Sequence, residues 1–158
     1  MGNIFAGSEI VAIGIQIEKN GRDFYNTLFT KSTKQKAKDI FEYLASEEEK
    51  HIAMFLKILD SLENYEPKEA FPQEYFAYMK VLAEKYVFTQ ENKGSEIAGN
   101  TKSDKDAIEL GIGFEKDSIA FYDGMKKVVP EGDVKIIDGL IAQEEEHLKR
   151  LSDLKNSL

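Results

Sequence analysis

The strongest constraint on the fold of this chain is an internal repeat. Residues 13–28 (IGIQIEKNGRDFYNTL) align without gaps to residues 110–125 (LGIGFEKDSIAFYDGM), with six identical residues in 16 positions. The segments that follow also match, LASEEEKH at 44–51 against LIAQEEEH at 140–147. A repeat of this kind indicates two copies of one structural unit that stack to bury a common core.

The periodicity of both copies is helical. Apolar residues recur at helical spacing over about residues 8–30, 33–62, 73–90, 103–128 and 133–155, and no run alternates with a period of two. Ser8 is a plausible N-cap of the first helix, and Ser103 followed by Asp106 is a capping pattern for the fourth. The polar, glycine-containing stretch 92–102 predicts a loop. Prolines at 67, 72 and 130 separate the segments.

These segments predict an all-α protein. Two helical hairpins, residues 8–62 and 104–157, are expected to form a four-helix bundle with approximate twofold symmetry. The linker 63–103 is expected to contain one shorter crossing helix. A length of 158 residues fits a single domain over 1–158.

Composition excludes several kinds of function. The sequence has no cysteine, which excludes a disulfide framework, a thiolate metal site and a cysteine nucleophile. A net charge of −8 argues against nucleic acid or an anionic membrane as a partner. No targeting segment is visible, and the apolar run 10–17 is far shorter than the ~20 residues that span a bilayer, so a cytoplasmic location is the default expectation.

The second helix of each copy places a carboxylate and an imidazole in an apolar stripe. Residues at helical spacing share one face, and glutamate and histidine stand at i and i+3 in both copies. The two stripes are Phe41, Leu44, Glu48, His51, Phe55, Ile58 and Ile137, Leu140, Glu144, His147, Leu151, Leu154. A buried carboxylate without a partner is costly, so its occurrence in both copies indicates a compensating ligand.

The first helix of each copy supplies a matching face with one glutamate. The equivalent residues are Gly14, Glu18, Gly21, Tyr25, Leu28 and Gly111, Glu115, Ser118, Tyr122, Met125. The small neighbours are expected to leave room beside each carboxylate for an ion or a small molecule. Tyr25 and Tyr122 are candidates to donate hydrogen bonds to the carboxylates, although core packing alone would also account for both tyrosines.

The four helices together offer Glu, Glu-x-x-His, Glu and Glu-x-x-His, the ligand set of di-iron and di-manganese carboxylate bundles. The predicted metal ligands are Glu18, Glu48, His51, Glu115, Glu144 and His147. Four carboxylates match the charge of two divalent ions, two of them can bridge, and oxygen and imidazole ligands suit Fe(II) or Mn(II).

One Glu-x-x-His pattern is common by chance. In this chain, however, both histidines fall in the pattern at equivalent positions of the repeat. The other glutamates of these segments are expected on solvated faces. Glu47 or Gln143 is a candidate to orient a histidine by hydrogen bonding to its second ring nitrogen.

At these residues the chain resembles the rubrerythrin family of the ferritin-like superfamily. The matching pieces are I-E-K-x-G-x-x-F-Y at 17–25, E-E-E-K-H at 47–51, F-E-K-D-S-I-x-F-Y at 114–122 and E-E-E-H at 144–147. They cover all four bundle helices. The resemblance implies a non-haem di-iron site held by the six predicted ligands, with peroxide reduction or a related oxidase activity.

Two departures from the family pattern bear on function. Typical rubrerythrins carry a cysteine-ligated rubredoxin domain that supplies electrons, and this sequence has no cysteine. They also carry an extra glutamate three residues after the ligand glutamate of the third bundle helix, where this chain has Ser118. The site is therefore expected to be the symmetric form, closer to that of bacterioferritin and of stand-alone rubrerythrin-like proteins.

The resulting hypothesis is a non-haem di-iron oxidoreductase that reduces hydrogen peroxide or dioxygen. It requires two iron ions and an external electron-donor protein, and the chain is expected to form a homodimer. Three alternatives remain open at this stage: an iron-binding or sequestration protein with ferroxidase activity, a manganese-dependent catalase, and a structural bundle with an inert site.

Overall fold

The computed structural model describes residues 2–62 and 73–158, and these residues form helices and short connections without any strand. The helices are α1 (Gly2–Lys31), α2 (Gln35–Leu62), α3 (Gln73–Lys85), the 3₁₀ helix η1 (Val87–Thr89), α4 (Lys93–Gly99), α5 (Asp104–Met125) and α6 (Glu131–Ser157). The all-α prediction is confirmed.

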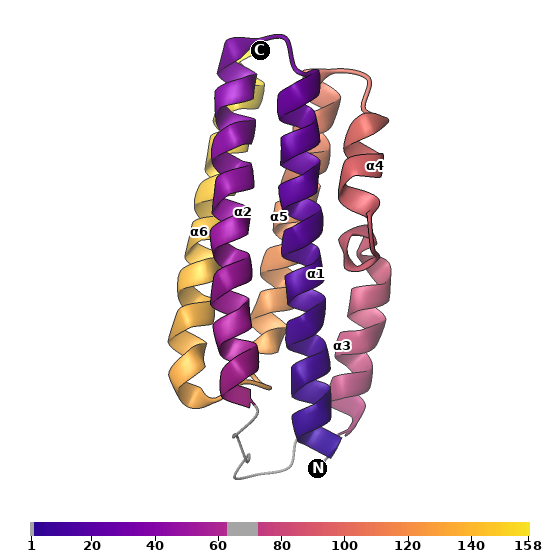
Figure 1. Ribbon diagram of the computed structural model, residues 1–158, viewed down its shortest axis with the longest axis vertical. Helices are drawn as coiled ribbons and strands as arrows, with labels where there is room; N and C mark the ends of the chain where they lie inside the picture. Colours follow the sequence, from indigo (N-terminus) through magenta and orange to yellow (C-terminus); the bar gives the residue numbers. More distant parts are fainter. Residues whose placement is uncertain (1, 63–72) are drawn as a thin grey trace.

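The four long helices form a bundle of two hairpins. Helix α1 packs against α2 and α5, and α6 packs against α5 and α2. Helices α3 and α4 follow each other along the outer side of α1 (Figure 1). The linker thus covers one face of the bundle with two helices, where the sequence predicted one crossing helix over residues 73–90. Prolines 67 and 72 lie outside the described residues.

Helix boundaries agree with the prediction at one capping site and differ at another. Ser103 Oγ accepts a hydrogen bond of 3.1 Å from the backbone N–H of Asp106, so the predicted cap of α5 is confirmed. Ser8 is not an N-cap, because α1 already begins at Gly2 and passes through it. No proline precedes Ser8 in the sequence, and a serine inside a helix costs little. Helix α5 ends at Met125, three residues before the predicted end.

The predicted loop at 92–102 is wrong in its first half, which forms α4. The cause is the buried side chain of Asn20 on α1. Its Nδ2 donates to the carbonyls of Phe88 and Gln90, and its Oδ1 accepts from the backbone N–H groups of Lys93 and Gly94. Asn20 thereby satisfies the first turn of α4, which local sequence cannot reveal because the partner lies more than 70 residues away.

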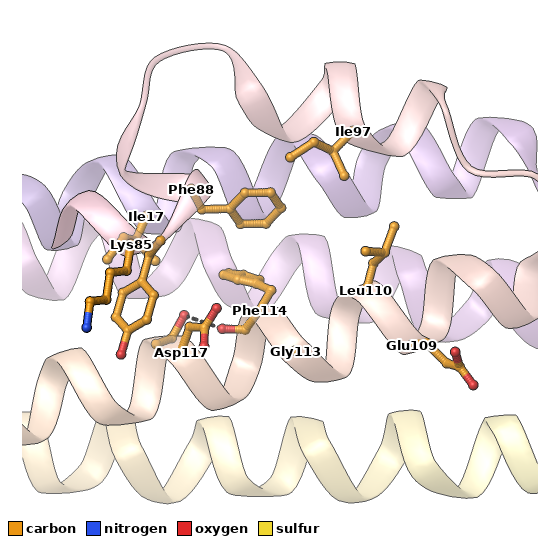
Figure 2. A pocket seen from close by; sticks show the side chains of 11 residues that line it. Ile17, Lys85, Phe88, Ile97, Glu109, Leu110, Gly113, Phe114 and Asp117 are labelled. Carbon is orange, nitrogen blue, oxygen red and sulfur yellow. Dashed lines mark hydrogen bonds between the residues drawn. The ribbon is translucent and has the colours of Figure 1, made fainter. Parts of the chain in front are cut away.

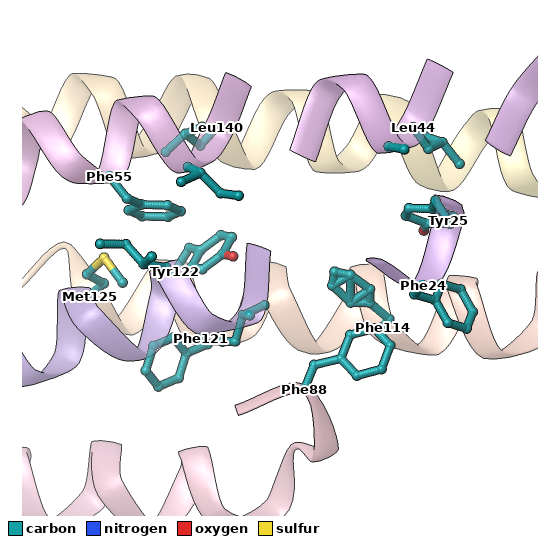
Figure 3. Packing of buried hydrophobic residues seen from close by; sticks show 14 of the residues in the cluster. Phe24, Tyr25, Leu44, Phe55, Phe88, Phe114, Phe121, Tyr122, Met125 and Leu140 are labelled. Atoms are coloured by element: carbon teal, nitrogen blue, oxygen red, sulfur yellow. The ribbon is translucent and has the colours of Figure 1, made fainter. Parts of the chain in front are cut away.

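Aromatic side chains fill the core on both sides of the central layer of buried glutamates and histidines. Tyr25, Tyr122, Phe41 and Phe55 are fully buried. The ring of Tyr122 lies 4.9 Å from that of Phe55 (Figure 3). The ring of Tyr25 lies 6.4 Å from that of Phe41. These rings exclude water from the layer between them, which holds the polar residues of the two repeats.

Within residues 2–62 and 73–158, no helix combines the length and the apolar character needed to cross a membrane.

Candidate metal centre

The structure brings all six predicted ligands together in the middle of the bundle. Glu18 comes from α1, Glu48 and His51 from α2, Glu115 from α5, and Glu144 and His147 from α6. Each is at most 1% exposed. The apolar residues predicted to share their stripes on α2 and α6 are buried as well. The i, i+3 spacing puts each glutamate and histidine on the same helical face, and the repeat duplicates the arrangement.

The ligands form two overlapping groups. One oxygen or nitrogen from each of Glu18, Glu48, His51 and Glu144 lies within 4.8 Å of the others, and the same holds for Glu48, Glu115, Glu144 and His147. Glu48 and Glu144 belong to both groups. The geometry therefore assigns two adjacent cation positions, with Glu48 and Glu144 placed between them and one glutamate and one histidine at each outer side.

The hydrogen-bonding state of the carboxylates agrees with this division. Among the described residues, both oxygens of Glu48 and both oxygens of Glu144 are buried without a hydrogen-bond partner. Glu18 and Glu115 each have one such oxygen, because the other accepts a tyrosine hydroxyl. Buried polar atoms in proteins are nearly always satisfied, so this concentration of unpartnered acceptors calls for cations. The residues present fit a pair of divalent ions.

Short contacts within the cluster support the same interpretation. His51 Nδ1 lies 2.8 Å from Glu144 Oε1 and 3.5 Å from Glu18 Oε2. None of these three atoms has a partner with the angles of a hydrogen bond. Nitrogen and oxygen atoms that approach one another in this way are aimed at a common point, as ligands of one ion are.

Tyr25 and Tyr122 contact the outer glutamates across the bundle. Tyr25 on α1 donates a hydrogen bond of 2.7 Å to Glu115 Oε1 on α5, and Tyr122 on α5 donates one of 2.6 Å to Glu18 Oε1 on α1. Burial, together with neighbouring carboxylates, raises the pKa of both tyrosines well above 10. The two phenols therefore stay protonated and act as donors that fix the carboxylates.

The two histidines have different surroundings. Gln143 Oε1 lies 2.6 Å from His51 Nε2, so a proton on that nitrogen leaves Nδ1 facing the carboxylates. The equivalent residue, Glu47, accepts from the Tyr43 hydroxyl and pairs with Lys50 instead. His147 Nε2 has no hydrogen-bond partner among the described residues. Of the two candidates named from sequence, only Gln143 contacts a histidine in this way.

The buried charges shift one another's protonation. Burial, and next the charge of Glu144, raises the pKa of Glu18 to about 7. Burial alone would lower the pKa of His51, but contacts with Glu144 and Glu18 raise it to about 10. Burial alone would raise the pKa of Glu144, but contacts with His147 and His51 lower it. In the absence of cations, protons on these groups neutralise part of the negative charge.

One expectation about the small residues needs correction. A Cβ at Gly21 would lie 2.5 Å from the ring of Phe114 and 3.2 Å from Glu48 Oε2, and one at Gly14 would lie 2.8 Å from Met125 Cε. Neighbouring side chains therefore occupy the space at these two glycines, and it is not left for a ligand. Ser118, the position of the extra family glutamate, donates its hydroxyl to the carbonyl of Phe114.

Comparison with known proteins gives a family and a fold. The rubrerythrin family model matches residues 9–155. A crystal structure of a protein from Thermotoga maritima, described as ferritin-like and diiron-carboxylate, is 27% identical in sequence and superposes with a TM-score of 0.70. That match covers 95% of this chain and 94% of the other. A search of curated proteins finds no significant match. The predicted ferritin-like bundle is confirmed.

Proposed function

The chain belongs to the rubrerythrin family, and from this premise we propose that it is a non-haem di-iron oxidoreductase that reduces hydrogen peroxide or dioxygen. The observation that carries the proposal concerns the buried side-chain oxygen and nitrogen atoms that have no hydrogen-bond partner in the described part of the chain: nine of these ten atoms lie on the six predicted ligands. The description of the Thermotoga maritima relative as a diiron-carboxylate protein supports iron as the metal.

Charge and ligand type support two divalent ions. The four glutamates carry four negative charges when ionised, which two divalent ions balance. Carboxylate and imidazole ligands suit Fe(II), and the absence of thiolate removes the ligand that favours structural zinc or copper(I). Glu48 and Glu144, which belong to both ligand groups, would be shared by the two irons, Glu18 and His51 would hold one iron, and Glu115 and His147 would hold the other.

When bound, two Fe(II) ions supply the two electrons that cleave the O–O bond, so that hydrogen peroxide and two protons give two water molecules. Glu48 and Glu144 would keep the two positions adjacent, because each belongs to both ligand groups. Tyr25 and Tyr122 hold the outer carboxylates in place through the whole cycle, because their phenols do not ionise near neutral pH. The surrounding aromatic residues keep bulk water away from the site.

We assign reduction of the centre to an external electron-donor protein. The 158 residues contain no cysteine, so they cannot build the thiolate iron site that feeds electrons to the centre in typical rubrerythrins.

The experiment is anaerobic loading with Fe(II), followed by mixing with hydrogen peroxide or dioxygen under optical detection. Wild-type protein is expected to bind two irons per chain and to be oxidised rapidly. Glu144→Gln, which keeps the shape of a bridging ligand but removes its charge, should abolish this oxidation. Glu145→Gln is the matched control, since Glu145 is the next residue on α6 and is exposed. If wild-type protein binds two irons and both oxidants leave them ferrous, the redox function is wrong.

A further inference from the structure

A cavity of about 240 Å³ lies beside the metal centre, between α5 and the linker that carries α3, η1 and α4. Its walls are mainly apolar and come from Ile17, Phe88, Ile97, Leu110 and Phe114 (Figure 2). Lys85 and Asp117 line one end, and Glu109 lines the other. The proposed redox function does not use this cavity.

One wall of the cavity is held in place by the buried side chain of Asn20. Phe88 lies in η1, and its carbonyl accepts a hydrogen bond of 2.7 Å from Asn20 Nδ2. Asn20 also donates a hydrogen bond to the carbonyl of Gln90 and accepts one from the backbone N–H of Gly94 at the start of α4. In the second repeat the equivalent residue is Asp117, which lines the cavity instead of holding a segment of chain. The space lies where the linker breaks the twofold symmetry of the bundle.

Phe114 separates the cavity from the metal ligands. Its ring lines the cavity on one side, and on the other it covers Gly21, where a Cβ would lie only 3.2 Å from Glu48 Oε2. Phe114 precedes Glu115 in α5, and Ser118, which also lines the cavity, follows one turn later. A molecule in the cavity would therefore lie one aromatic ring away from a bridging carboxylate.

The walls define the chemistry of a ligand. The cavity opens to solvent on one side, where Leu110 and Gly113 are exposed. An enclosed apolar cavity of about 150 Å³ binds benzene, so a volume of about 240 Å³ has room for an aromatic ring with one or two small substituents. The rings of Phe88 and Phe114 pack directly against each other, with centroids 4.4 Å apart and planes tilted by 55°. Together they form one aromatic wall against which such a ring can pack.

The polar end favours a neutral group. Lys85 and Asp117 carry opposite charges and are both exposed, at the mouth of the cavity. Lys85 forms no ion pair with any residue in the described ranges. Tyr86 lines the cavity beside them. A hydroxyl group can accept from the lysine and donate to the carboxylate. Glu109, at the other end, is already paired with Lys155 at 3.0 Å.

We propose that this cavity binds a small neutral phenol, with its ring packed against Phe88 and Phe114 and its hydroxyl at Lys85 and Asp117. Binding needs no redox turnover, so it is independent of the proposed oxidoreductase activity and can be tested even if that activity fails.

The experiment is isothermal titration calorimetry of the full-length, iron-loaded protein with 4-methylphenol under anaerobic conditions. Gly113 lines the cavity, is exposed, and has nothing within 4 Å of an added Cβ, so Gly113→Leu should project into the cavity without strain. Gly139→Leu is the matched control, since Gly139 is an exposed helical glycine on α6 that is equally open and does not line the cavity. Leucine favours helix over glycine at both positions.

Saturable binding to wild-type protein and to Gly139→Leu is expected, with affinity about tenfold lower or worse in Gly113→Leu. Toluene, which lacks the hydroxyl and with it both hydrogen bonds, should bind about tenfold more weakly than 4-methylphenol or worse. The proposal is overturned if wild-type protein shows no saturable heat up to the solubility limit of the probe. Equal affinity in the two leucine variants would also overturn it, and equal affinity for toluene would overturn the placement of the hydroxyl.

Discussion

The hydroxyl of Tyr122 donates a hydrogen bond of 2.6 Å to Glu18 Oε1, and this contact joins the two halves of the repeat across the metal cluster. Both side chains are fully buried. The equivalent pair, Tyr25 and Glu115, makes the same contact in the opposite direction, from α1 to α5. Each outer glutamate is therefore positioned by a tyrosine from the other hairpin.

Tyr122→Phe should lower the free energy of unfolding and weaken metal binding at the position formed by Glu18 and His51. It leaves Glu18 Oε1 buried without a donor, which costs about 1–3 kcal/mol of unfolding free energy. Urea denaturation measures that loss, and an Fe(II) titration should show weaker binding of one of the two irons. Tyr78→Phe is the control, because Tyr78 is 58% exposed. Equal stability and iron affinity in both variants would show that the Tyr122 hydroxyl only fills space.

Bridging and outer glutamates should differ in metal stoichiometry. Glu48→Gln removes a ligand that both cation positions share, so both irons should be lost or strongly weakened. Glu18→Gln removes a ligand from one position only, and one iron should be retained. Metal analysis after gel filtration measures the ratio, with Glu49→Gln, at an exposed neighbouring residue, as control. Identical stoichiometry in Glu48→Gln and Glu18→Gln would contradict the assignment of the bridging ligands.

The sequence predicts the bundle and the cluster because the repeat constrains both. Two equivalent helical stripes with Glu-x-x-His can bury their polar residues only by facing each other, and the structure places all six predicted ligands together. The sequence names Tyr25 and Tyr122 as candidate donors to the carboxylates, and the structure adds that each donates to the glutamate of the other repeat. The division into shared and outer carboxylates does not, because it depends on side-chain positions that helical periodicity leaves open.

The linker was predicted less well, for a physical reason. Its second helix, α4, is short, begins after Asn92 in a left-handed conformation and takes its first-turn hydrogen bonds from Asn20. Local propensity over residues 92–102 favours a loop, and a contact more than 70 residues away reverses that preference. The one signal in the sequence was the polar Asn20 next to an apolar face, in a position where the other repeat has Asp117.

Asn20→Ala should release the linker from the bundle. Four backbone groups lose their partner, and with partial rehydration the expected loss is about 3 kcal/mol of unfolding free energy. Hydrogen exchange should accelerate in η1 and α4 before the rest of the chain. Asn26→Ala, at an exposed position of the same helix, is the control. Unchanged exchange in α4 would mean that other contacts hold the linker.

Two glycines of α4 should respond oppositely to alanine. A Cβ at Gly94 would lie 1.9 Å from the backbone oxygen of Asn20, so α4 would have to move away from α1, and we expect a loss of about 3 kcal/mol or more. Gly99 has nothing within 4 Å of an added Cβ, and Gly99→Ala should leave stability unchanged or slightly raised. Thermal unfolding of both variants tests the close approach of the two helices.

Removing the metal should make stability depend on pH with a defined sign. In the metal-free protein the pKa of Glu18 is raised from 4.5 to about 7, so folding favours its protonated form. The stability from this shift is fully present below pH 4.5 and is lost as the pH rises through 7. It amounts to about 3 kcal/mol. The pKa of His51 is raised from 6.5 to about 10, so its contribution is lost in turn as the pH approaches 10.

Urea denaturation of the chelated protein between pH 5 and pH 9 should therefore show a steady fall in unfolding free energy, while the iron-loaded protein stays nearly constant. Burial alone would lower the pKa of His147, but contact with Glu144 raises that pKa as well. Glu18→Gln removes the group whose pKa is raised to about 7, so the metal-free variant should lose less stability between pH 5 and pH 7 than the metal-free wild type. Parallel curves for these two proteins would assign the pH dependence to another group. A rise in stability between pH 5 and pH 9 would contradict the direction of both shifts, because it would require the unfolded protein to bind more protons than the folded protein in this range. The pKa of Glu144 is lowered from 4.5, so that group titrates below this range.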